Sequence, residues 1–296
     1  MNTDAILKSI EAVRVLAAGD VWLDRWAKHD PFLSTPSPET GLASTVVVAA
    51  ENSPGGCGLA AAAAAALGAS VTLLGAAGDD GAAVDLRRAL EQARVPSIHL
   101  LAAASPTAVT TRLIHARSGV EDAGRIEVVQ FQQPESVAEE FRAEFRRLAG
   151  EVECVIAVDA RPSSLGGLMG TVGRAVMEEA AGAGCLVWVD SPDGFERIGS
   201  AERSSLRIRP DGQGGIGIEE GSVRRTVPET SPEHPLDPHG ARETFSTACA
   251  LALATGAAAV EAVRFALLAA SVCMMKPGAR CASPEEILRA EREWSE

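Results

Sequence analysis

CVIAVD, at Cys154–Asp159, is the stretch of sequence that decides the fold. It is an apolar run that ends in an acid, and the same pattern occurs at Arg14–Asp20 and at Cys185–Asp190. Short, continuous apolar runs are typical of strands that are buried on both faces of a parallel sheet. The repeated terminal aspartate therefore predicts a doubly wound, mostly parallel sheet with ligand-contacting groups at the carboxyl ends of its strands.

The segments around these strands predict helices and one smaller sheet. Helical periodicity favours helices at Ala82–Ala93 and Pro134–Leu148, and parallel sheets require this alternation of strand and helix. Two extended segments, Ser44–Ala50 and Ala108–Phe131, are predicted to pair in a small side sheet. Gly194–Pro235 is the least regular region, and we expect a hairpin across Gly212–Val227. We expect one α/β domain over residues 1–296, with the side sheet inserted at about 44–50 and 108–131.

Composition excludes two classes of protein. The 296 residues carry a formal net charge of −13, with a pI near 4.9. A general nucleic-acid binder or a protein that binds anionic membranes needs a cationic face, so neither class fits. The hydrophobic content of 46% excludes a chain that is disordered throughout.

The cysteines and the N-terminal residues indicate the cellular compartment of the protein. The six cysteines include no CxxC pair and are predicted to be reduced, mostly buried thiols. Met1–Glu11 lacks the basic start and apolar core of a signal peptide. The longest apolar tract, Leu59–Leu67, is too short to cross a bilayer. We expect a cytoplasmic protein with no membrane segment.

Asp237–Phe245 is the likeliest place for chemistry. It is predicted to form a loop that enters an Ala/Leu-rich helix, with Glu243 in the first helical turn. The first backbone N–H groups of a helix lack intrahelical partners and attract anions. Taken alone, Glu243 also fits ordinary helix capping.

Several motifs, in this order along the chain, together resemble the ribokinase family of carbohydrate kinases. They are Gly19–Arg25 (GDVWLDR), Gly55-Gly56, Gly78–Asp80, Pro106–Arg112, Gly240–Phe245 and Lys276–Gly278. Within the family, the likeness is greatest to the D-glycero-β-D-manno-heptose-7-phosphate kinase type, on the strength of GDVxLDR, Ser37-Pro38-Glu39 and the ordering of Pro106–Arg112. The resemblance extends from Val13 to Leu288.

This resemblance implies a kinase that transfers phosphate from ATP, with Mg, to a sugar hydroxyl. It implies that the side sheet is a lid and that the lid joins two copies in a homodimer. Glu243 takes the position of the catalytic base, with Arg242 beside it. The other positions implied are sugar contacts at Asp20, Asp24, Gly55, Gly56 and Arg112, and anion or nucleotide contacts at Gly240, Ala241, Lys276 and Gly278.

The chain departs from the family pattern at positions that handle phosphate and sugar. Arg242 replaces a glycine, which predicts a blocked backbone approach or a change of φ. Glu243 is one methylene longer than the usual aspartate, and Leu59 replaces a sugar-binding asparagine. Thr110 and Asp193 stand where lysines are expected.

The segment from Asp190 to Gly212 is also shorter than in the family and lacks an N-x-x-E motif. That motif normally supports the metal and the triphosphate of the nucleotide.

Two main hypotheses follow from these observations. The first is a pseudokinase that keeps a sugar or nucleotide pocket, or only a dimer surface, and regulates a partner. The alternative is an active sugar or sugar-phosphate kinase in which Glu243 is the base and Arg242 clamps the phosphoryl group. A third, weaker hypothesis recruits Cys57 or His239 for another reaction.

Overall fold

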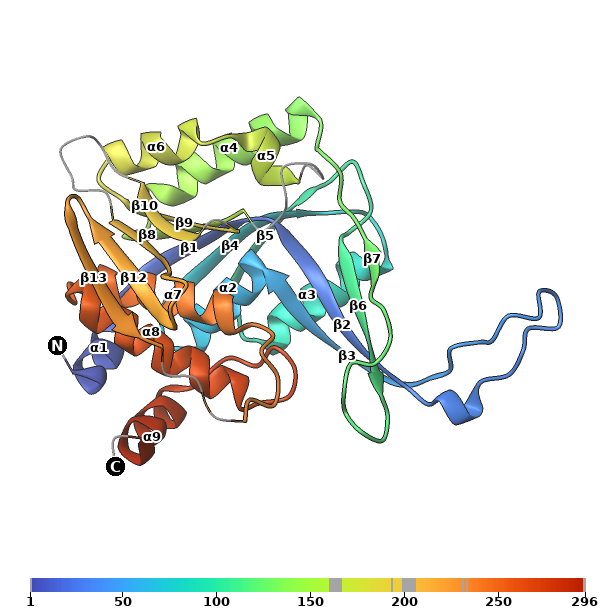
Figure 1. Ribbon diagram of the computed structural model, residues 1–296. Helices are drawn as coiled ribbons and strands as arrows, with labels where there is room; N and C mark the ends of the chain where they lie inside the picture. The colour runs from blue at the N-terminus through green and yellow to red at the C-terminus, as the bar shows by residue number, and fades with distance from the viewer. Residues whose placement is uncertain are drawn as a thin grey trace.

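The chain forms a nine-stranded sheet between two layers of helices, and a second sheet stands to one side (Figure 1). The computed structural model describes residues 2–159, 167–192, 194–198, 206–229, 232 and 234–294. The main sheet has the order β13-β12-β11-β10-β9-β8-β1-β4-β5. Its strands are β1 (Arg14–Gly19), β4 (Ser70–Ala77), β5 (Ser97–Ala102), β8 (Cys154–Val158), β9 (Leu186–Ser191), β10 (Gly194–Ile198), β11 (Leu206–Pro210), β12 (Gly215–Glu220) and β13 (Val223–Pro228).

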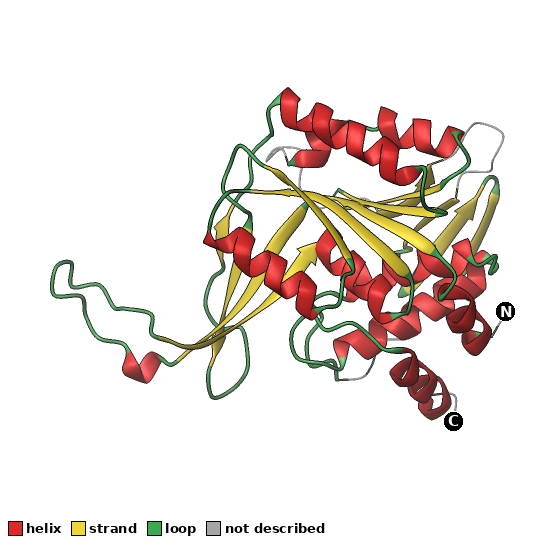
Figure 2. Ribbon diagram, turned by 180° about the vertical axis from the view of Figure 1, so that it is seen from behind, coloured by secondary structure: helices red, strands yellow, loops and turns green. Residues whose placement is uncertain are grey.

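The helices cover both faces of the main sheet, as the view from behind also shows (Figure 2). On one face pack α4 (Glu135–Ala149), α5 (Leu168–Val172) and α6 (Ala175–Gly182). On the other pack α1 (Thr3–Ile10), α2 (Cys57–Ala66), α3 (Gly81–Gln92), α7 (Ala241–Ala254), α8 (Ala259–Met274) and α9 (Pro284–Trp294). None of the helices in the described ranges is long and apolar enough to span a membrane.

The predicted buried strands are confirmed. Successive side chains of β1 enter opposite cores: Val15 and Ala17 pack with α2 and α7, whereas Leu16 and Ala18 pack with α4. β1 lies between β4 and β8 and runs parallel to both. This arrangement places the carboxyl ends of β1, β8 and β9 along one edge of the sheet.

The side sheet has the order β3-β2-β6-β7, and we refer to this sheet as the lid. Its strands are β2 (Val21–His29), β3 (Val47–Gly56), β6 (Val109–His115) and β7 (Ile126–Val128). Between β2 and β3 the chain extends away from the body as a narrow arm that includes the 3-10 turn η1 (Pro31–Leu33) (Figure 1). We call residues 30–46 the arm.

The predicted pairing of the side sheet was wrong. Val21–His29 is the central lid strand, and Ser44–Ala50 pairs with it and not with Ala108–Phe131. β2 and β6 run parallel. Ser97–Ala102 belongs to the main sheet.

Gly194–Pro235 also holds β10 and β11, in addition to the expected hairpin. β10 turns straight back along β9, so an antiparallel strand follows Asp190 directly. This hairpin explains in structural terms why the segment after Asp190 is short.

Gly56 joins the lid to the main domain. It ends β3 and is the residue before α2, with φ 59° and ψ −131°. A Cβ atom at this position would lie 2.3 Å from the backbone oxygen of Asp20. Only glycine fits this backbone and this close approach.

We predict that Gly56→Ala lowers the free energy of unfolding by about 2 kcal/mol or more, because it forces an L-residue into this conformation. Gly81→Ala is the matched control, since nothing lies within 4 Å of a Cβ atom there. Urea denaturation followed by circular dichroism measures both variants. Equal stability of the two variants would contradict the role given to Gly56.

Candidate functional site

The predicted catalytic turn lies at the amino end of α7, beside the carboxyl edge of the main sheet. Gly240 precedes the helix with φ 83°, and no side chain caps the helix. Leu59 closes the space behind the turn: a Cβ atom on Gly240 would lie 3.0 Å from its Cδ2 atom. Gly240 and Ala241 therefore stand at an uncapped helix end, as expected, with an apolar wall where the family has asparagine.

Arg242 turns its guanidinium toward the end of β9. Its Nε and Nη2 atoms lie 3.0 and 2.7 Å from Oδ1 of Asp190. The Asp190 side chain is 3% exposed and that of Arg242 is 44% exposed. Burial raises the pKa of Asp190, and the guanidinium opposes this rise. Arg242 thus compensates the negative charge of Asp190, and a buried carboxylate is tolerated only with such a partner.

The backbone of Arg242 is ordinary helix. Arg94 is the only residue other than glycine with positive φ in the described part of the chain. The expectation that Arg242 requires a changed φ was therefore wrong, because Arg242 itself stands in the first turn of α7 with a helical backbone. The arginine acts through its side chain.

Glu243 is partly buried in the first turn of α7. Burial raises its pKa, and the charges of Asp190 and Asp24 raise it further, while its own backbone N–H and Arg242 oppose the rise. A carboxylate with a raised pKa suits a general base near neutral pH. The same environment is costly if the group has no substrate to act on.

Asp24 and Arg112 meet on the face of the lid that looks toward α7. Arg112 Nη2 lies 3.3 Å from Asp24 Oδ1, and the indole nitrogen of Trp22 donates to Asp24 Oδ2 at 3.1 Å. Burial raises the pKa of Asp24, against the influence of Arg112. The Nε atom of Arg112 has no hydrogen-bond partner within the described ranges, although the residue is only 8% exposed. Two predicted sugar contacts are thus brought together.

The remaining predicted sugar contacts are engaged in the fold. Asp20 is 2% exposed, and its Oδ1 atom accepts from the backbone N–H of Leu168 at 2.9 Å, at the start of α5. Gly55 and Gly56 lie under the ring of Trp22: a Cβ atom on Gly55 would be 2.1 Å from the indole nitrogen.

A network of His239 and Asp237 ties the lid to the loop before α7. The backbone N–H of His239 donates to Asp237 Oδ1 at 2.9 Å, and its ring contacts the same carboxylate. From the lid, Glu121 lies 3.8 Å from His239 Nε2. Gly278 donates its backbone N–H to Asp237 Oδ2 at 2.9 Å.

Lys276 lies away from the catalytic turn. Its Nζ donates to the backbone oxygen of Cys281 at 2.8 Å and pairs with Glu286 of α9. Gly278 contacts Asp237 in the loop before α7. Lys276 instead binds the loop after α8 to α9.

A cavity of about 380 Å³ lies beside Arg242. Apolar side chains of β10, β11 and α8 line it, with Asp190 and Arg242 at one end. The apolar part suits a base ring. The end near α7 does not suit a triphosphate, because Asp190 is an acid and Arg242 is already bonded to it. Asp193 lies outside the described residues.

No group of three or more His, Cys, Asp and Glu side chains within the described residues is placed to hold a metal ion. All six cysteines are free, as expected. Burial raises the pKa of Cys57 well above its ordinary range, and its thiol contacts the backbone oxygen of Gly19 at 3.4 Å. Cys57 is therefore a packing residue. Of the two residues that the third hypothesis recruits, only His239 remains.

Sequence reasoning missed Trp22, Trp26 and the partner of Arg242. Trp22, Asp24 and Trp26 are spaced two residues apart along β2. In a strand this spacing predicts that all three side chains lie on the same face. Asp190 was noticed as a strand-end acid, but only the structure pairs it with Arg242.

The sequence of the chain is similar to those of known carbohydrate kinases. Residues 24–165 match the family described as pfkB family carbohydrate kinase. The chain is 27% identical to the bifunctional protein HldE of Alcanivorax borkumensis over 314 residues, and 28% identical to that of Methylococcus capsulatus over 319. These alignments cover 96% and 95% of the chain. The chain spans 64% of the length of each of these relatives.

Solved structures give the fold. A possible 1-phosphofructokinase of Thermotoga maritima matches with a TM-score of 0.70 at 14% identity, covering 94% of this chain and 97% of that one. Phosphofructokinase-2 of Escherichia coli matches with a TM-score of 0.66 at 18% identity, covering 96% and 100%. The fold is a ribokinase-like α/β fold.

We predict that Glu243→Gln raises the melting temperature by a few degrees at pH 8 and by less at pH 5. A raised pKa in the folded state means that ionised Glu243 costs stability as the pH rises through that pKa, whereas the amide does not ionise. Thermal unfolding across this pH range measures the difference. Glu139→Gln, at an exposed position on α4, is the control. A gain that does not grow with pH would refute the assignment.

Proposed function

Because this chain belongs to the pfkB family of carbohydrate kinases, we propose that it binds a sugar phosphate in the cytoplasm and transfers phosphate from ATP poorly or not at all. In this proposal it acts by binding, as a pseudokinase that regulates a partner. A heptose phosphate is the ligand that the sequence motifs favour. Asp24 and Arg112 are the proposed contacts.

The pair of Arg242 and Asp190 is the observation that carries this proposal. A catalytic turn must offer free donors to the phosphoryl oxygens. Here the guanidinium beside the turn is bonded twice to Asp190, at 2.7 and 3.0 Å. Releasing it would leave a carboxylate that is 3% exposed without a partner, which is costly. Arg242 therefore neutralises Asp190 instead of clamping a phosphate.

The sugar side of the cleft supports binding. Arg112 is a buried cation with an unused donor, and Asp24 beside it is a buried acceptor. A sugar hydroxyl placed between them would accept a hydrogen bond from Arg112 and donate one to Asp24. Asp20, Gly55 and Gly56 contribute less in this proposal, since α5 and Trp22 already engage them.

The alternative is an active kinase, and Glu243 is the observation that favours it. Its raised pKa and its place at the start of α7 suit a base that takes the proton of a sugar hydroxyl. ATP and Mg would supply the phosphoryl group in that case. Without activity, no cofactor is proposed.

We predict that ATP consumption with a panel of sugar phosphates, including D-glycero-D-manno-heptose 7-phosphate, does not exceed that of Glu243→Gln. A coupled ADP-release assay measures it. In thermal-shift titrations, the sugar phosphate alone is expected to stabilise the protein, because a ligand that binds only the folded state raises its stability.

Sugar-dependent ATP use that disappears in Glu243→Gln would reject the pseudokinase and support the alternative. Arg242→Gly combined with Asp190→Asn is the second variant: it removes the pair without leaving a buried charge. Failure of every sugar phosphate to stabilise the wild type would reject both readings of the site.

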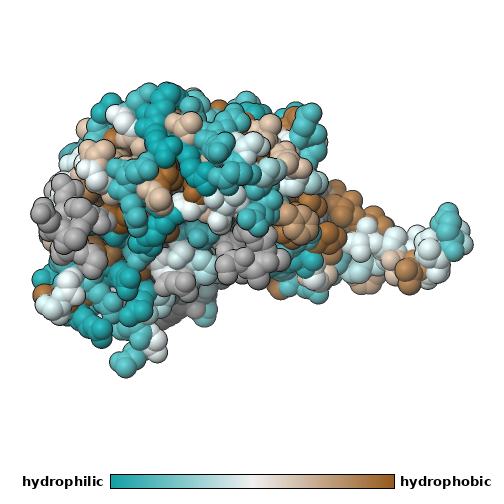
Figure 3. All heavy atoms as spheres, turned by 90° about the horizontal axis from the view of Figure 1, so that it is seen from above, coloured by the Kyte–Doolittle hydropathy of each residue, from teal (hydrophilic) through white to brown (hydrophobic). Residues whose placement is uncertain are grey.

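We also propose that the arm and the outer lid join two copies of the chain. The arm carries exposed Phe32, Leu33 and Leu42, which are 73%, 52% and 71% exposed. Hydrophobic residues gather where the arm leaves the body (Figure 3), among them Val47 and Val48. The arm extends away from the core, and its two sides are joined by the isolated bridge of Pro36 with Ala43. A second copy is the proposed cover for these side chains.

We predict that the wild type is a dimer by size-exclusion chromatography with light scattering, and that Phe32→Ser/Leu33→Ser/Leu42→Ser is a monomer. The triple change removes the exposed apolar area of the arm. Val84→Ser, on α3 and 58% exposed, is expected to stay dimeric. A wild type that is monomeric at all concentrations would refute the proposed dimer.

A further inference from the structure

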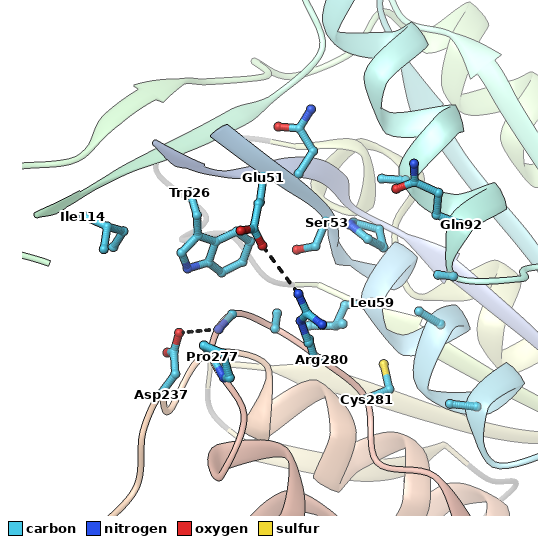
Figure 4. A pocket seen from close by; sticks show the side chains of 18 of the residues that line it. Trp26, Glu51, Ser53, Leu59, Gln92, Ile114, Asp237, Pro277, Arg280 and Cys281 are labelled. Carbon is cyan, nitrogen blue, oxygen red and sulfur yellow. Dashed lines mark hydrogen bonds and ion pairs between the residues drawn. The ribbon is translucent and has the colours of Figure 1, made fainter. Parts of the chain in front are cut away.

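The groove between the lid and the loop that follows α8 belongs to the candidate sugar site. Its volume is about 660 Å³, and Leu59, Asp237 and Pro277 stand in its wall (Figure 4). A second cluster of polar side chains lies elsewhere, on β5 at the open edge of the main sheet (Figure 1). We call it the edge cluster, and it consists of Ser97 and His99 of β5 with Glu144 of α4.

The side chains of the edge cluster form a continuous chain of hydrogen bonds. The Oγ atom of Ser97 lies 3.1 Å from Nε2 of His99, and Nδ1 of the same ring lies 3.1 Å from Oε1 of Glu144. Ser97 and His99 are two residues apart on one strand, so their side chains share the face of β5 that contacts α4. The side chains of His99 and Glu144 are 32% and 25% exposed, so a small molecule can reach the cluster from solvent.

Arg147 fixes the direction of these hydrogen bonds. Its Nε and Nη2 atoms donate to the carboxylate of Glu144 at 2.9 and 2.6 Å, and these bonds lower the pKa of Glu144. An ionised carboxylate only accepts hydrogen bonds, so the proton between Glu144 and His99 stands on Nδ1. In the neutral ring, Nε2 then carries a lone pair and accepts a hydrogen bond from the hydroxyl of Ser97.

A backbone N–H group points to the open edge beside Ser97. Ala103 donates its N–H to the backbone oxygen of Ala77 on β4 at 2.8 Å. Backbone groups alternate in direction along a strand, so the N–H of Ser97 also faces β4, whereas that of Ile98 faces the open edge. No strand within the described ranges pairs with this edge. The N–H group of the residue after a nucleophile is a usual donor to the oxyanion in acyl transfer.

We propose that the edge cluster is a nucleophilic site that hydrolyses activated esters of small carboxylic acids. Ser97 is the nucleophile, His99 is the general base, and Glu144 is the positioning residue that holds the ring of His99. A partly exposed site supplies little binding energy, so the ester needs a good leaving group. This activity is separate from the proposed binding of a sugar phosphate.

The reaction needs only the ester and water. The Oγ atom of Ser97 forms a bond to the carbonyl carbon of the ester while its proton moves to Nε2 of His99, and the N–H of Ile98 donates to the oxyanion. The bond from that carbon to the leaving oxygen then breaks, and the leaving oxygen takes the proton from His99. Water releases the acyl group from Ser97 by the same transfers. The products are an alcohol and a carboxylic acid.

Incubation of the full chain with p-nitrophenyl acetate tests this site. The wild type is expected to release p-nitrophenol above the rate in buffer, and acid-quenched samples are expected to carry an acetyl group on Ser97 by peptide mass spectrometry. Ser97→Ala loses both signals. His99→Gln lowers the rate of release about a hundredfold or more, because a general base contributes at least this factor. Circular dichroism shows whether each variant is folded.

Glu144→Ala tests the positioning role. It is expected to lower the rate of release about tenfold or more, because the ring of His99 loses the acceptor that fixes its tautomer. Proton–nitrogen correlation NMR of the imidazole is expected to show the proton of His99 on Nδ1 in the wild type and a mixture of tautomers in Glu144→Ala. A carboxylate that only tethers β5 to α4 would leave the rate unchanged.

Ser9→Ala is the matched control and is expected to behave like the wild type. Ser9 is exposed, and its hydroxyl donates to the backbone oxygen of Ala5 and not to a histidine. A rate of release that is unchanged in Ser97→Ala, or acetylation that is confined to other residues, overturns the inference. Release no faster than in buffer at millimolar ester also overturns it. Each of these outcomes leaves the proposed sugar site untouched.

Discussion

The structure depends on one buried carboxylate at the point where the chain leaves the main sheet and enters the lid. Asp20 separates β1 from β2, and its backbone N–H and oxygen bond to Val158 and Cys57. Its side chain accepts from the first backbone N–H of α5. The amino end of a helix stabilises the negative charge of an acid, and the acid in turn accepts hydrogen bonds from the free N–H groups of that helix end. One residue thereby fixes the lid, β8, α2 and α5 relative to each other, so its function in this chain is that of a joint.

The amino end of α7 shows how charge constrains the rest of the cleft. Burial raises the pKa values of Asp190, Glu243 and Asp24, and the charges of Asp190 and Asp24 raise the pKa of Glu243 further. Arg242 and Arg112 supply the compensating charge, and each is bonded to one of these acids. Such a cleft resists a triphosphate more than it resists a neutral sugar. Arg242, which replaces the glycine of the family, and Asp190 at the end of β9 are best understood as one ion pair.

The sequence predicted the main fold because that information is local. An apolar run followed by aspartate identifies β1, β8 and β9, and their shared edge follows from the parallel arrangement. β10 and β11 were missed because their Gly-, Arg- and Pro-rich sequence carries no clear period. The site was predicted only as a set of positions. The pairing of Arg242 with Asp190 joins residues 52 positions apart, and the packing of Trp22 on Gly55 depends on lid register, so neither is readable from spacing.

The hairpin of β9 and β10 divides the main sheet into two halves that differ in the distance along the chain between partners. From β9 to β13, successive strands are antiparallel neighbours. In the other half, β1 pairs with both β4 and β8, and the pairing of Val15 with Cys154 joins residues that are separated by nearly half of the chain. Closing short loops costs less entropy than closing long ones, and local contacts form sooner. The topology therefore favours early assembly of the antiparallel half, and we expect the insertion of β1 between its two distant partners to be the slower step.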